Sequence, residues 1–243
     1  MNLIIPYPGE NLLELGKRCD AVYVCPKIGS QRMGPLVVYA GTDDRGRNYV
    51  GDIYFNFRRI ESHLKAVEAY AEAAHQKLRD QHLLDMFDTI CGLPNGGRTF
   101  GQELARVIGK RFVYPDKKPK PTEAGKKQEY TWDLSQFDFE RGERVAMAED
   151  VFNNFKNTDI NTEEIEVTGA KVVLLVGALN RSLIYDTSYK GLPVVASIRE
   201  PYPEYEQDDP AVVVDIVAGN LELEVKKNWP RLRAIMEKYS KAA

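Results

Sequence analysis

Apolar residues follow a helical spacing in one long segment of this chain. Between residues 58 and 84 the apolar positions, beginning with Ile60, Leu64 and Val67, recur every three or four residues and alternate with glutamate and lysine. An apolar stripe of this period, with charge on the opposite face, is typical of an amphipathic helix packed on a core. The pattern predicts one helix over residues 58–84.

Five short apolar runs predict strands. The first is followed by a glycine-rich turn and by a helical pattern that ends at Gly109, and residues 158–164 open a further short helix that Gly169 ends. Strands that alternate with helices predict an α/β fold with a mostly parallel, doubly wound sheet flanked by helices. The five runs are residues 88–91, 110–114, 144–148, 171–178 and 192–198.

A lysine-rich segment interrupts this pattern. Residues 116–144 carry almost no apolar periodicity, and such a segment cannot bury enough surface to form core. We expect a long mobile loop at 115–143, with hairpin character around Tyr130 and Trp132.

The two ends of the chain lie outside the strand and helix pattern of the core. Residues 1–56 are rich in turns, and the tail 201–243 has a helical pattern over residues 221–239 that Pro230 is expected to break. We therefore expect one compact domain, in which residues 57–200 form the α/β core.

Composition excludes several classes of protein. The 243 residues carry a net charge of −3, which argues against a general nucleic-acid binder, and no apolar run approaches the roughly 20 residues that span a membrane. The N-terminus lacks a basic segment followed by a long apolar one, so we expect a cytoplasmic protein. The three cysteines form no CxxC pair, and the histidines are spaced unlike a metal site, so we expect the histidines to be solvated or interfacial residues of a helix. The histidines are His63, His75 and His82.

Two adjacent acids follow the third predicted strand. Glu149 and Asp150 come directly after an apolar run, and amides, a lysine and Thr158 lead into the next helix. Open parallel sheets bind ligands outside the carboxyl ends of their strands, and helix N-termini bind phosphate. Two carboxylates there can hold the hydroxyls of a ribose, with donors beyond them for its 5′-phosphate. A solvated turn after a strand is the alternative, but the combination predicts a phosphosugar site.

This segment resembles the ribose-phosphate signature of the type I phosphoribosyltransferases. In that family an apolar run, two acids and an apolar residue precede T-T-G-x-S/T and a helix, and this chain keeps the run, both acids, Val151 and Thr158. The resemblance implies that Glu149 and Asp150 hold the ribose hydroxyls of phosphoribosyl pyrophosphate (PRPP). It places the 5′-phosphate at a replaced turn, among Asn153, Asn154, Lys156, Asn157 and Thr158.

A glycine turn supplies a second match. The segment FDTICGLPNGG, residues 87–97, is similar to the F-D-x-x-x-G-x-x-x-G-G turn of the orotate branch of the family. Glycine lets the backbone approach an anion closely and adopt positive φ. The resemblance implies a pyrophosphate site formed by Asn95, Gly96, Gly97 and Arg98.

The lysine-rich loop supplies a third match. Lys117 and Lys120 fall on the two lysines of the family's R-K-x-x-K-x-H-G, while Asp116 and Thr122 replace the arginine and the histidine. The resemblance implies that these lysines close over the pyrophosphate of a second subunit. We therefore expect a homodimer with loop 115–143 contributed in trans. Taken alone, the loop would be interpreted as a solvated run of charge.

Base recognition rests on weaker matches. Tyr54 and Phe55 lie where the family has an aromatic pair, for which ordinary packing is an equal alternative, and Arg181 falls on an arginine that contacts orotate. The family's base-binding lysine aligns with Tyr39, ahead of an extra stretch at residues 42–50.

Taken together, the resemblance implies a type I phosphoribosyltransferase fold with an N-terminal hood. The implied reaction is orotate plus PRPP giving orotidine 5′-monophosphate and pyrophosphate, with catalysis by Lys117, Lys120, Glu149 and Asp150. Mg²⁺ would be held by PRPP and water, without direct protein ligands. Two alternatives remain open: transfer to another nucleobase, and a non-catalytic regulator of the same fold that senses PRPP.

Overall fold

The chain divides into two compact units. The computed structural model describes residues 3–119 and 130–240. Residues up to 12 cluster with residues 61–200, and residues 13–60 cluster with the segment from 201 onward. The second unit therefore combines the segments expected to form the hood and the tail.

The first unit contains the α/β core. Its elements, in chain order, are α3 (Leu64–Asp80), the 3₁₀ helix η1 (Leu84–Met86), β7 (Thr89–Gly92), α4 (Gly96–Ile108), β8 (Arg111–Val113), β9 (Asp116–Pro119), β10 (Tyr130–Asp133), β11 (Arg144–Phe152), α5 (Lys156–Val167), β12 (Lys171–Asn180), β13 (Ser188–Tyr189) and β14 (Leu192–Arg199). All five predicted core strands and both predicted helices of this region are confirmed.

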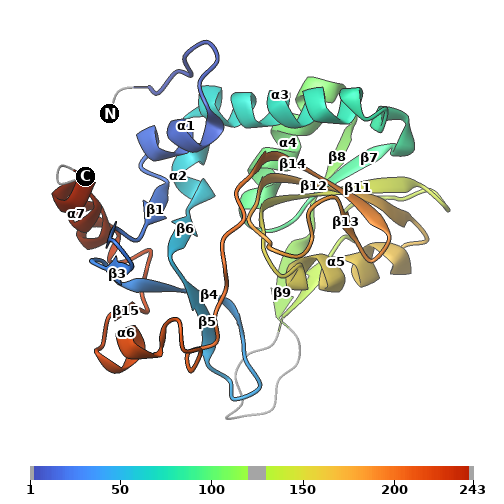
Figure 1. Ribbon diagram of the computed structural model, residues 1–243. Coiled ribbons are helices and arrows are strands. Elements are labelled where there is room, and N and C mark those ends of the chain that lie inside the picture. The colour runs from blue at the N-terminus through green and yellow to red at the C-terminus, as the bar shows by residue number, and fades with distance from the viewer. Residues whose placement is uncertain (1–2, 120–129, 241–243) are drawn as a thin grey trace. The chain divides into compact units, whose positions relative to one another are not determined.

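Six strands form the central sheet, in the order β13-β14-β12-β11-β7-β8. All neighbouring strands are parallel except the short edge strand β13. Helices α3 and α4 cover one face, and α5 lies on the other (Figure 1). Counting the parallel strands along the chain gives the order 2-1-3-4-5, whose switch point lies between β7 and β11. Ligands bind outside the carboxyl ends of the strands at such a point.

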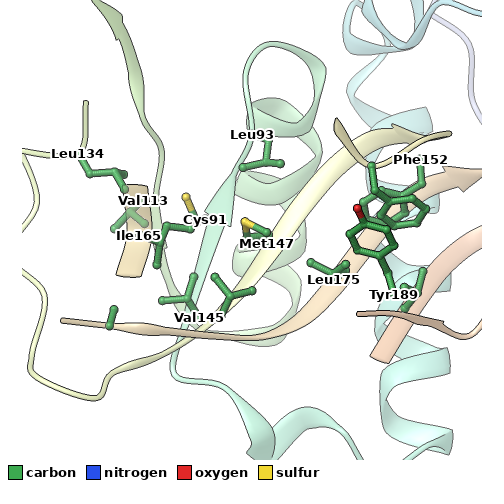
Figure 2. Close-up of a cluster of buried hydrophobic side chains, with 14 residues drawn as sticks. Cys91, Leu93, Val113, Leu134, Val145, Met147, Phe152, Ile165, Leu175 and Tyr189 are labelled. Atoms are coloured by element: carbon green, nitrogen blue, oxygen red, sulfur yellow. The ribbon is translucent and has the colours of Figure 1, made fainter. Parts of the chain in front are cut away.

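One hydrophobic cluster packs on the central sheet (Figure 2). Buried side chains from neighbouring strands, such as Cys91, Met147 and Leu175, pack across it. Leu134 also belongs to this cluster, and Phe137 packs against it. The expectation that the whole of residues 116–144 stays out of the core is therefore wrong. Leu134 and Phe137 are isolated apolar residues in a polar segment, so no apolar periodicity indicated that they are buried.

The predicted helix over residues 58–84 is two helices. α2 (Phe57–Glu61) ends before His63, whose backbone is non-helical at φ −123° and ψ 83°, and α3 begins at Leu64. His63 is buried, and its Nδ1 accepts a hydrogen bond from the backbone N–H of Ile4 at 3.4 Å. The solvated alternative is thus wrong for His63, which contacts the N-terminal segment as an interfacial residue at the N-cap of α3.

The second unit is built from short elements. They are α1 (Leu12–Arg18), β1 (Val22–Val24), β2 (Lys27–Ile28), β3 (Gln31–Arg32), β4 (Leu36–Thr42), β5 (Asn48–Gly51), β6 (Ile53–Phe55), most of α2, α6 (Val213–Val217), β15 (Leu221–Glu222) and α7 (Trp229–Ser240). The extra stretch at 42–50 is the turn of the β4–β5 hairpin, where Asp43 accepts hydrogen bonds from two backbone N–H groups at 2.8 and 3.0 Å.

Pro230 begins a helix instead of breaking one. It is the second residue of α7, where proline is favoured because its missing N–H has no partner within the helix anyway. The preceding residues Leu221 and Glu222 form β15, which pairs in parallel with β4. The helix expected over residues 221–239 therefore starts eight residues later, because the first residues of that segment pair with β4 as a strand.

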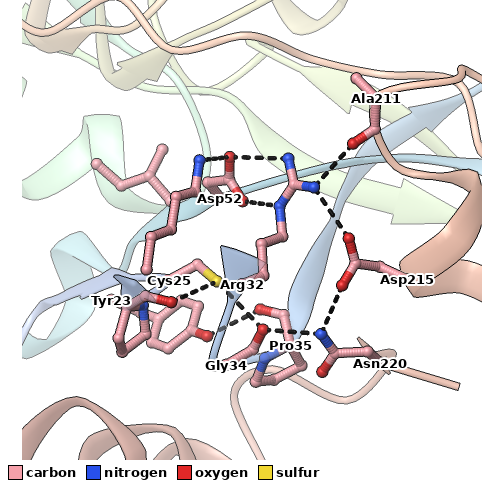
Figure 3. A network of polar contacts seen from close by, with 12 residues as sticks. Tyr23, Cys25, Arg32, Gly34, Pro35, Asp52, Ala211, Asp215 and Asn220 are labelled. Atoms are coloured by element: carbon pink, nitrogen blue, oxygen red, sulfur yellow. Dashed lines mark hydrogen bonds and ion pairs between the residues drawn. The ribbon is translucent and has the colours of Figure 1, made fainter. Parts of the chain in front are cut away.

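A buried polar network holds the second unit together (Figure 3). Arg32 donates to Asp52 through Nε at 2.6 Å and to Asp215 through Nη1 at 2.9 Å. Asn220 in turn donates to Asp215 at 2.9 Å and to the carbonyl of Gly34 at 3.0 Å. The network joins the β2–β3 hairpin to the segment that carries α6.

Among the described residues, no helix is both long and apolar enough to cross a membrane.

Candidate active site

Three predicted site segments of the first unit meet at one edge of the sheet. β7 ends at Gly92, β11 at Phe152 and β12 at Asn180. In the parallel register Ala148 lies opposite Gly92, and Phe152 opposite Asn180. The glycine turn, the acid pair with its following turn, and Arg181 therefore all follow the carboxyl ends of adjacent strands at the switch point.

The glycines of the turn allow helix α4 to press against β11. A Cβ at Gly96 would overlap Asp150 Oδ2 and lie 2.6 Å from its Cγ. A Cβ at Gly97 would overlap the carbonyl oxygen of Ala148 and lie 2.8 Å from Glu149 Cα. Both glycines are helical and neither has positive φ, so the expected need for positive φ is wrong at this turn. The requirement is close packing, which brings the N-terminus of α4 onto the acid pair.

Asn95 and Arg98 occupy the start of the same helix. Asn95 is the N-cap residue of α4. The Arg98 guanidinium lies 3.9 Å from the ring centroid of Tyr114 and donates to the carbonyl of Pro115 at 2.9 Å and to Asp116 at 3.1 Å. Arg98 thereby joins the glycine turn to the beginning of the lysine-bearing hairpin.

The two acids at the end of β11 differ in environment. Glu149 is 5% exposed, whereas Asp150 is half-buried. Burial, and then the neighbouring charge of Asp150, raise the pKa of Glu149 well above its usual value. The neutral form of Glu149 is therefore favoured, and a neutral carboxyl group can both donate and accept hydrogen bonds. The pair offers a ribose one donor and several acceptors.

The turn after the acids leads directly into α5. Asn153 and Asn154 are half-buried, Asn157 is exposed and Thr158 is buried at the first turn of the helix. The backbone of Lys156 opens α5, and its side chain lies outside what the structure describes. Phe155, the N-cap residue, has φ 58° and ψ 17° in the left-handed region. The predicted 5′-phosphate residues thus surround a helix N-terminus.

The lysine loop begins as a hairpin. β9 and β10 pair antiparallel, with Lys117 opposite Trp132, which confirms the expected hairpin character around Tyr130 and Trp132. Lys118 forms an ion pair with Asp133. Lys120 and the rest of residues 120–129 lie outside the described part of the chain, as does the side chain of Lys117.

Arg181 lies where β12 ends. It is 6% exposed, and its backbone N–H donates to the carbonyl of Phe152 at 3.0 Å. The neighbouring Asn180 is fully buried, and its amide donates to the carbonyl of Tyr185 at 2.7 Å while its oxygen accepts from the N–H of Ser182 at 3.0 Å. Asn180 therefore shapes the loop that carries Arg181.

The aromatic pair belongs to the second unit. Tyr54 is half-buried in β6 and packs edge-on against Trp229, at 6.1 Å between centroids. Phe55 is 8% exposed and packs against Phe57. Tyr54 also lines a pocket of about 340 Å³. The other lining residues are Val38, Leu223, Glu224, Val225, Lys226 and Lys227.

The position aligned with the family's lysine is closed off. Tyr39 is 6% exposed, and its hydroxyl accepts a hydrogen bond from the N–H of Ile53 at 3.4 Å. A Cβ at Gly51 would lie 2.6 Å from its ring. Tyr39 is therefore a packed core residue of the second unit.

Curated proteins with similar sequences are named orotate phosphoribosyltransferase. No protein-family model matches the chain. Curated orotate phosphoribosyltransferases from a Nitratiruptor species and from Wolinella succinogenes are 30% identical over 100 residues and 27% identical over 131 residues. These matches cover 41% and 54% of this chain, and 45% and 58% of the relatives. The chain thus spans about half the length of the curated relatives that it matches.

A solved structure extends the likeness over more of the fold. Orotate phosphoribosyltransferase from Aeropyrum pernix aligns with a TM-score of 0.53 at 17% identity, covering 78% of this chain and 93% of that protein. The chain therefore has the fold of the type I phosphoribosyltransferases. The predicted fold class and the resemblance to this family, with orotate phosphoribosyltransferases as its relatives, are confirmed.

The donor set of this phosphoribosyltransferase-like site suits a metal carried by the substrate. Among the residues that the structure describes, no group of three His, Cys, Asp or Glu side chains could hold a metal ion. Asp150 presents a single half-exposed carboxylate beside the glycine turn. Mg²⁺ keeps several waters and binds through few carboxylates, and a single carboxylate such as Asp150 is compatible with that preference.

Sequence reasoning missed two features of this phosphoribosyltransferase fold. Asn180 shapes the Arg181 loop from a fully buried position, and Phe155 sits between other aromatic rings. An asparagine at the end of an apolar run was a usable signal, because an amide that is buried there must have hydrogen-bond partners. The ring contacts of Phe155 gave no such signal, since Tyr185 and Tyr189 are about thirty residues distant in the sequence.

Proposed function

We propose that this protein is an orotate phosphoribosyltransferase, which converts orotate and PRPP to orotidine 5′-monophosphate and pyrophosphate. One observation carries the proposal: the glycine turn and the acid pair are in direct contact at the switch point, with Gly96 against the Asp150 carboxylate. A ribose held by Glu149 and Asp150 would have its pyrophosphate at the N-terminus of α4. Its 5′-phosphate would lie at the turn that opens α5. The names of the curated relatives favour orotate as the base.

The chemistry proposed for this site is displacement at C1′ of the ribose. Neutral Glu149 donates to one ribose hydroxyl, and Asp150 accepts from the other. Lys117 and Lys120 neutralise charge on the departing pyrophosphate, and bound Mg²⁺ would supply further positive charge there. No covalent nucleophile is needed, because positioning and electrostatic stabilisation of the leaving group lower the barrier.

Arg181 is the residue of the first unit that is proposed to contact the base. The planar guanidinium of Arg181 matches a carboxylate and a carbonyl together, which are the groups that orotate presents. Tyr54 offers a ring face for stacking, whereas Phe55 is buried against Phe57. We assign Tyr54 to the base and Phe55 to support of the strand.

An assay tests the reaction directly. The protein is mixed with Mg²⁺, orotate and PRPP, and the loss of orotate absorbance is followed. We expect turnover that falls at least about a hundredfold in Asp150→Asn and in Lys117→Ala, since both changes remove charge stabilisation. Turnover with a purine base or uracil and none with orotate would reassign the base. PRPP binding without turnover of any base would favour the regulator.

The aromatic pair provides a test of base recognition. Tyr54→Ala is expected to raise KM for orotate about tenfold or more while KM for PRPP stays near its original value, because stacking area on the base is lost. Phe55→Ala is the matched control. It is expected to lower the free energy of unfolding by about 3 kcal/mol, the usual cost of emptying a buried aromatic position. Steady-state kinetics and urea unfolding of both variants distinguish the two roles, and equal effects on KM for orotate would contradict the assignment.

A further inference from the structure

The turn proposed to hold the 5′-phosphate contains a bulky residue in a glycine-like conformation. Phe155 lies in the turn that replaces the glycine-containing turn of the family signature, and its φ is 58°. A left-handed backbone is unfavourable for large L-residues, and glycine adopts it freely. Something in the surroundings must therefore hold Phe155 in place.

A stack of aromatic rings surrounds Phe155. Its ring is 3% exposed and lies nearly parallel between two others, at 4.6 Å from Phe152 with an interplanar angle of 11° and at 4.5 Å from Tyr189 with an angle of 16°. Tyr185 meets it edge-on at 5.4 Å. Figure 2 shows the labelled rings of Phe152 and Tyr189 lying together at one end of the core cluster. Offset and edge-on ring pairs at such distances are attractive.

The rings come from three separate segments, which fixes the turn from several sides. Phe152 ends β11, and a Cβ at Gly177 in the neighbouring strand β12 would lie 2.6 Å from its ring, so this glycine makes room for it. Tyr185 lies in the loop after β12, and Tyr189 belongs to β13. The stack therefore connects the turn to two other strands of the sheet.

Polar contacts bind the same strand to the first turn of α5. The Tyr189 hydroxyl donates to Asp159 Oδ2 at 2.9 Å, and Lys190 pairs with Asp159 Oδ1 at 2.8 Å. The N–H of Asp159 donates to the carbonyl of Phe155 at 3.1 Å, which is the first backbone bond of the helix. The position of Phe155 thus sets where α5 begins and how its free N–H groups are presented.

We propose that Phe155, clamped between Phe152 and Tyr189, is a positioning residue for the 5′-phosphate turn. The stack holds a left-handed residue at the start of α5. This inference rests on the proposed function, because it assigns the turn to the phosphate of a phosphoribosyl ligand. Phe152 and Tyr189 act on the turn through Phe155 and are not proposed to contact the phosphate.

The test uses ribose 5-phosphate and pyrophosphate as separate probes, with binding measured by calorimetry. We expect Phe155→Gly and Tyr189→Leu to raise Kd for ribose 5-phosphate about tenfold or more, since small displacements of a binding group cost this much. Phe155→Gly is the decisive variant, because glycine keeps the backbone conformation and removes only the ring. Phe155→Tyr and Tyr189→Phe retain stacking and should stay within about threefold of the original Kd. Pyrophosphate affinity should be unchanged in all four.

Loss of the fold is controlled within the same core. Ile165→Ala removes a buried side chain from the hydrophobic cluster that contains Phe155, and Ile165 is no part of the aromatic stack. It should lower stability without changing Kd for ribose 5-phosphate. Should Phe155→Gly fail to fold, Tyr189→Leu and Tyr189→Phe give the same comparison from the other side of the stack.

The outcomes separate the two proposals. If the unaltered protein binds ribose 5-phosphate and Phe155→Gly binds it equally well, the clamp is refuted and the proposed function stands. If the unaltered protein binds neither ribose 5-phosphate nor PRPP, the proposed function itself fails. A rise in Kd for Ile165→Ala equal to that for Phe155→Gly would mean that loss of stability alone weakens binding, and it would overturn the proposed role of the clamp.

Discussion

Gly96 and Gly97 show how closely single residues control this site. Both lie where α4 meets β11, and neither position has room for a Cβ. The neighbouring atoms differ, however. At Gly96 the obstacle is the Asp150 carboxylate, which can rotate away, whereas at Gly97 it is the backbone of Ala148 and Glu149.

Alanine at these two glycines should therefore act differently. Gly96→Ala is expected to fold with little loss of stability but to displace Asp150 and raise KM for PRPP about tenfold or more. Gly97→Ala is expected to lower the free energy of unfolding by about 1–3 kcal/mol, since a backbone cannot yield as a side chain can. Urea unfolding and PRPP kinetics of the two variants test the contrast. Identical losses of stability would contradict it.

Glu149 makes stability depend on pH in an unusual direction for an acid. Burial raises its pKa in the folded protein, so its contribution to stability is full below the unfolded value of about 4.3 and is lost as pH rises through the raised pKa. We expect the free energy of unfolding to fall as pH rises from the unfolded value through the raised pKa, and to fall less in Glu149→Gln. Urea unfolding followed by circular dichroism measures both. Parallel pH profiles for the two proteins would exclude a neutral Glu149.

At the scale of elements, regular apolar patterns were sufficient to predict helices and strands, except where contacts with distant segments change the local structure. The apolar runs predict the core strands, because a strand that is buried on both faces carries apolar residues at nearly every position. The break at His63 and the strand β15 depend on partners far away in the chain, Ile4 and β4 respectively. A local pattern contains no information about such partners.

The Arg32 network gives an element-level prediction for the second unit. The Arg32 side chain is 9% exposed and Asp52 is 6% exposed, so removing one leaves a buried charge. Arg32→Ala is expected to lower the free energy of unfolding by about 3 kcal/mol. Lys27→Ala removes the other, 40% exposed partner of Asp52 and should cost less than about 1 kcal/mol. In a Trp132→Phe background, fluorescence of Trp229 reports this unit in urea, and equal costs would refute the network's importance.

The same network predicts acid sensitivity. Burial raises the pKa of Asp52, but hydrogen bonds from Arg32 and Lys27 outweigh it and hold the pKa below its usual value. Its contribution to stability is therefore present above the unfolded value of about 3.9 and is lost as pH falls through the lowered pKa. Trp229 fluorescence should show this loss in the Trp132→Phe protein, and Asp52→Asn should abolish that part of the pH dependence.

At the scale of the whole molecule, the open question is whether two chains share a site. We propose a homodimer in which the lysine hairpin of one subunit completes the site of the other. Mixing Lys117→Ala with Asp150→Asn chains under subunit exchange tests this. One site of each mixed dimer would then be intact, and half of the dimers would be mixed, so activity should return to about a quarter of the original. No recovery in a mixture shown to exchange would mean that the loop acts within its own chain.

The sequence by itself determined the α/β core, the order of its strands along the chain, and the segments that could form a phosphosugar site. These features rest on local periodicity and on short motifs. Only the tertiary structure decided that Gly96 packs on Asp150, that residues 201–240 join residues 13–60, and that a stack of rings holds Phe155. Each of these depends on which distant segments become neighbours. That choice is made by packing of the complete chain, and no local pattern encodes it.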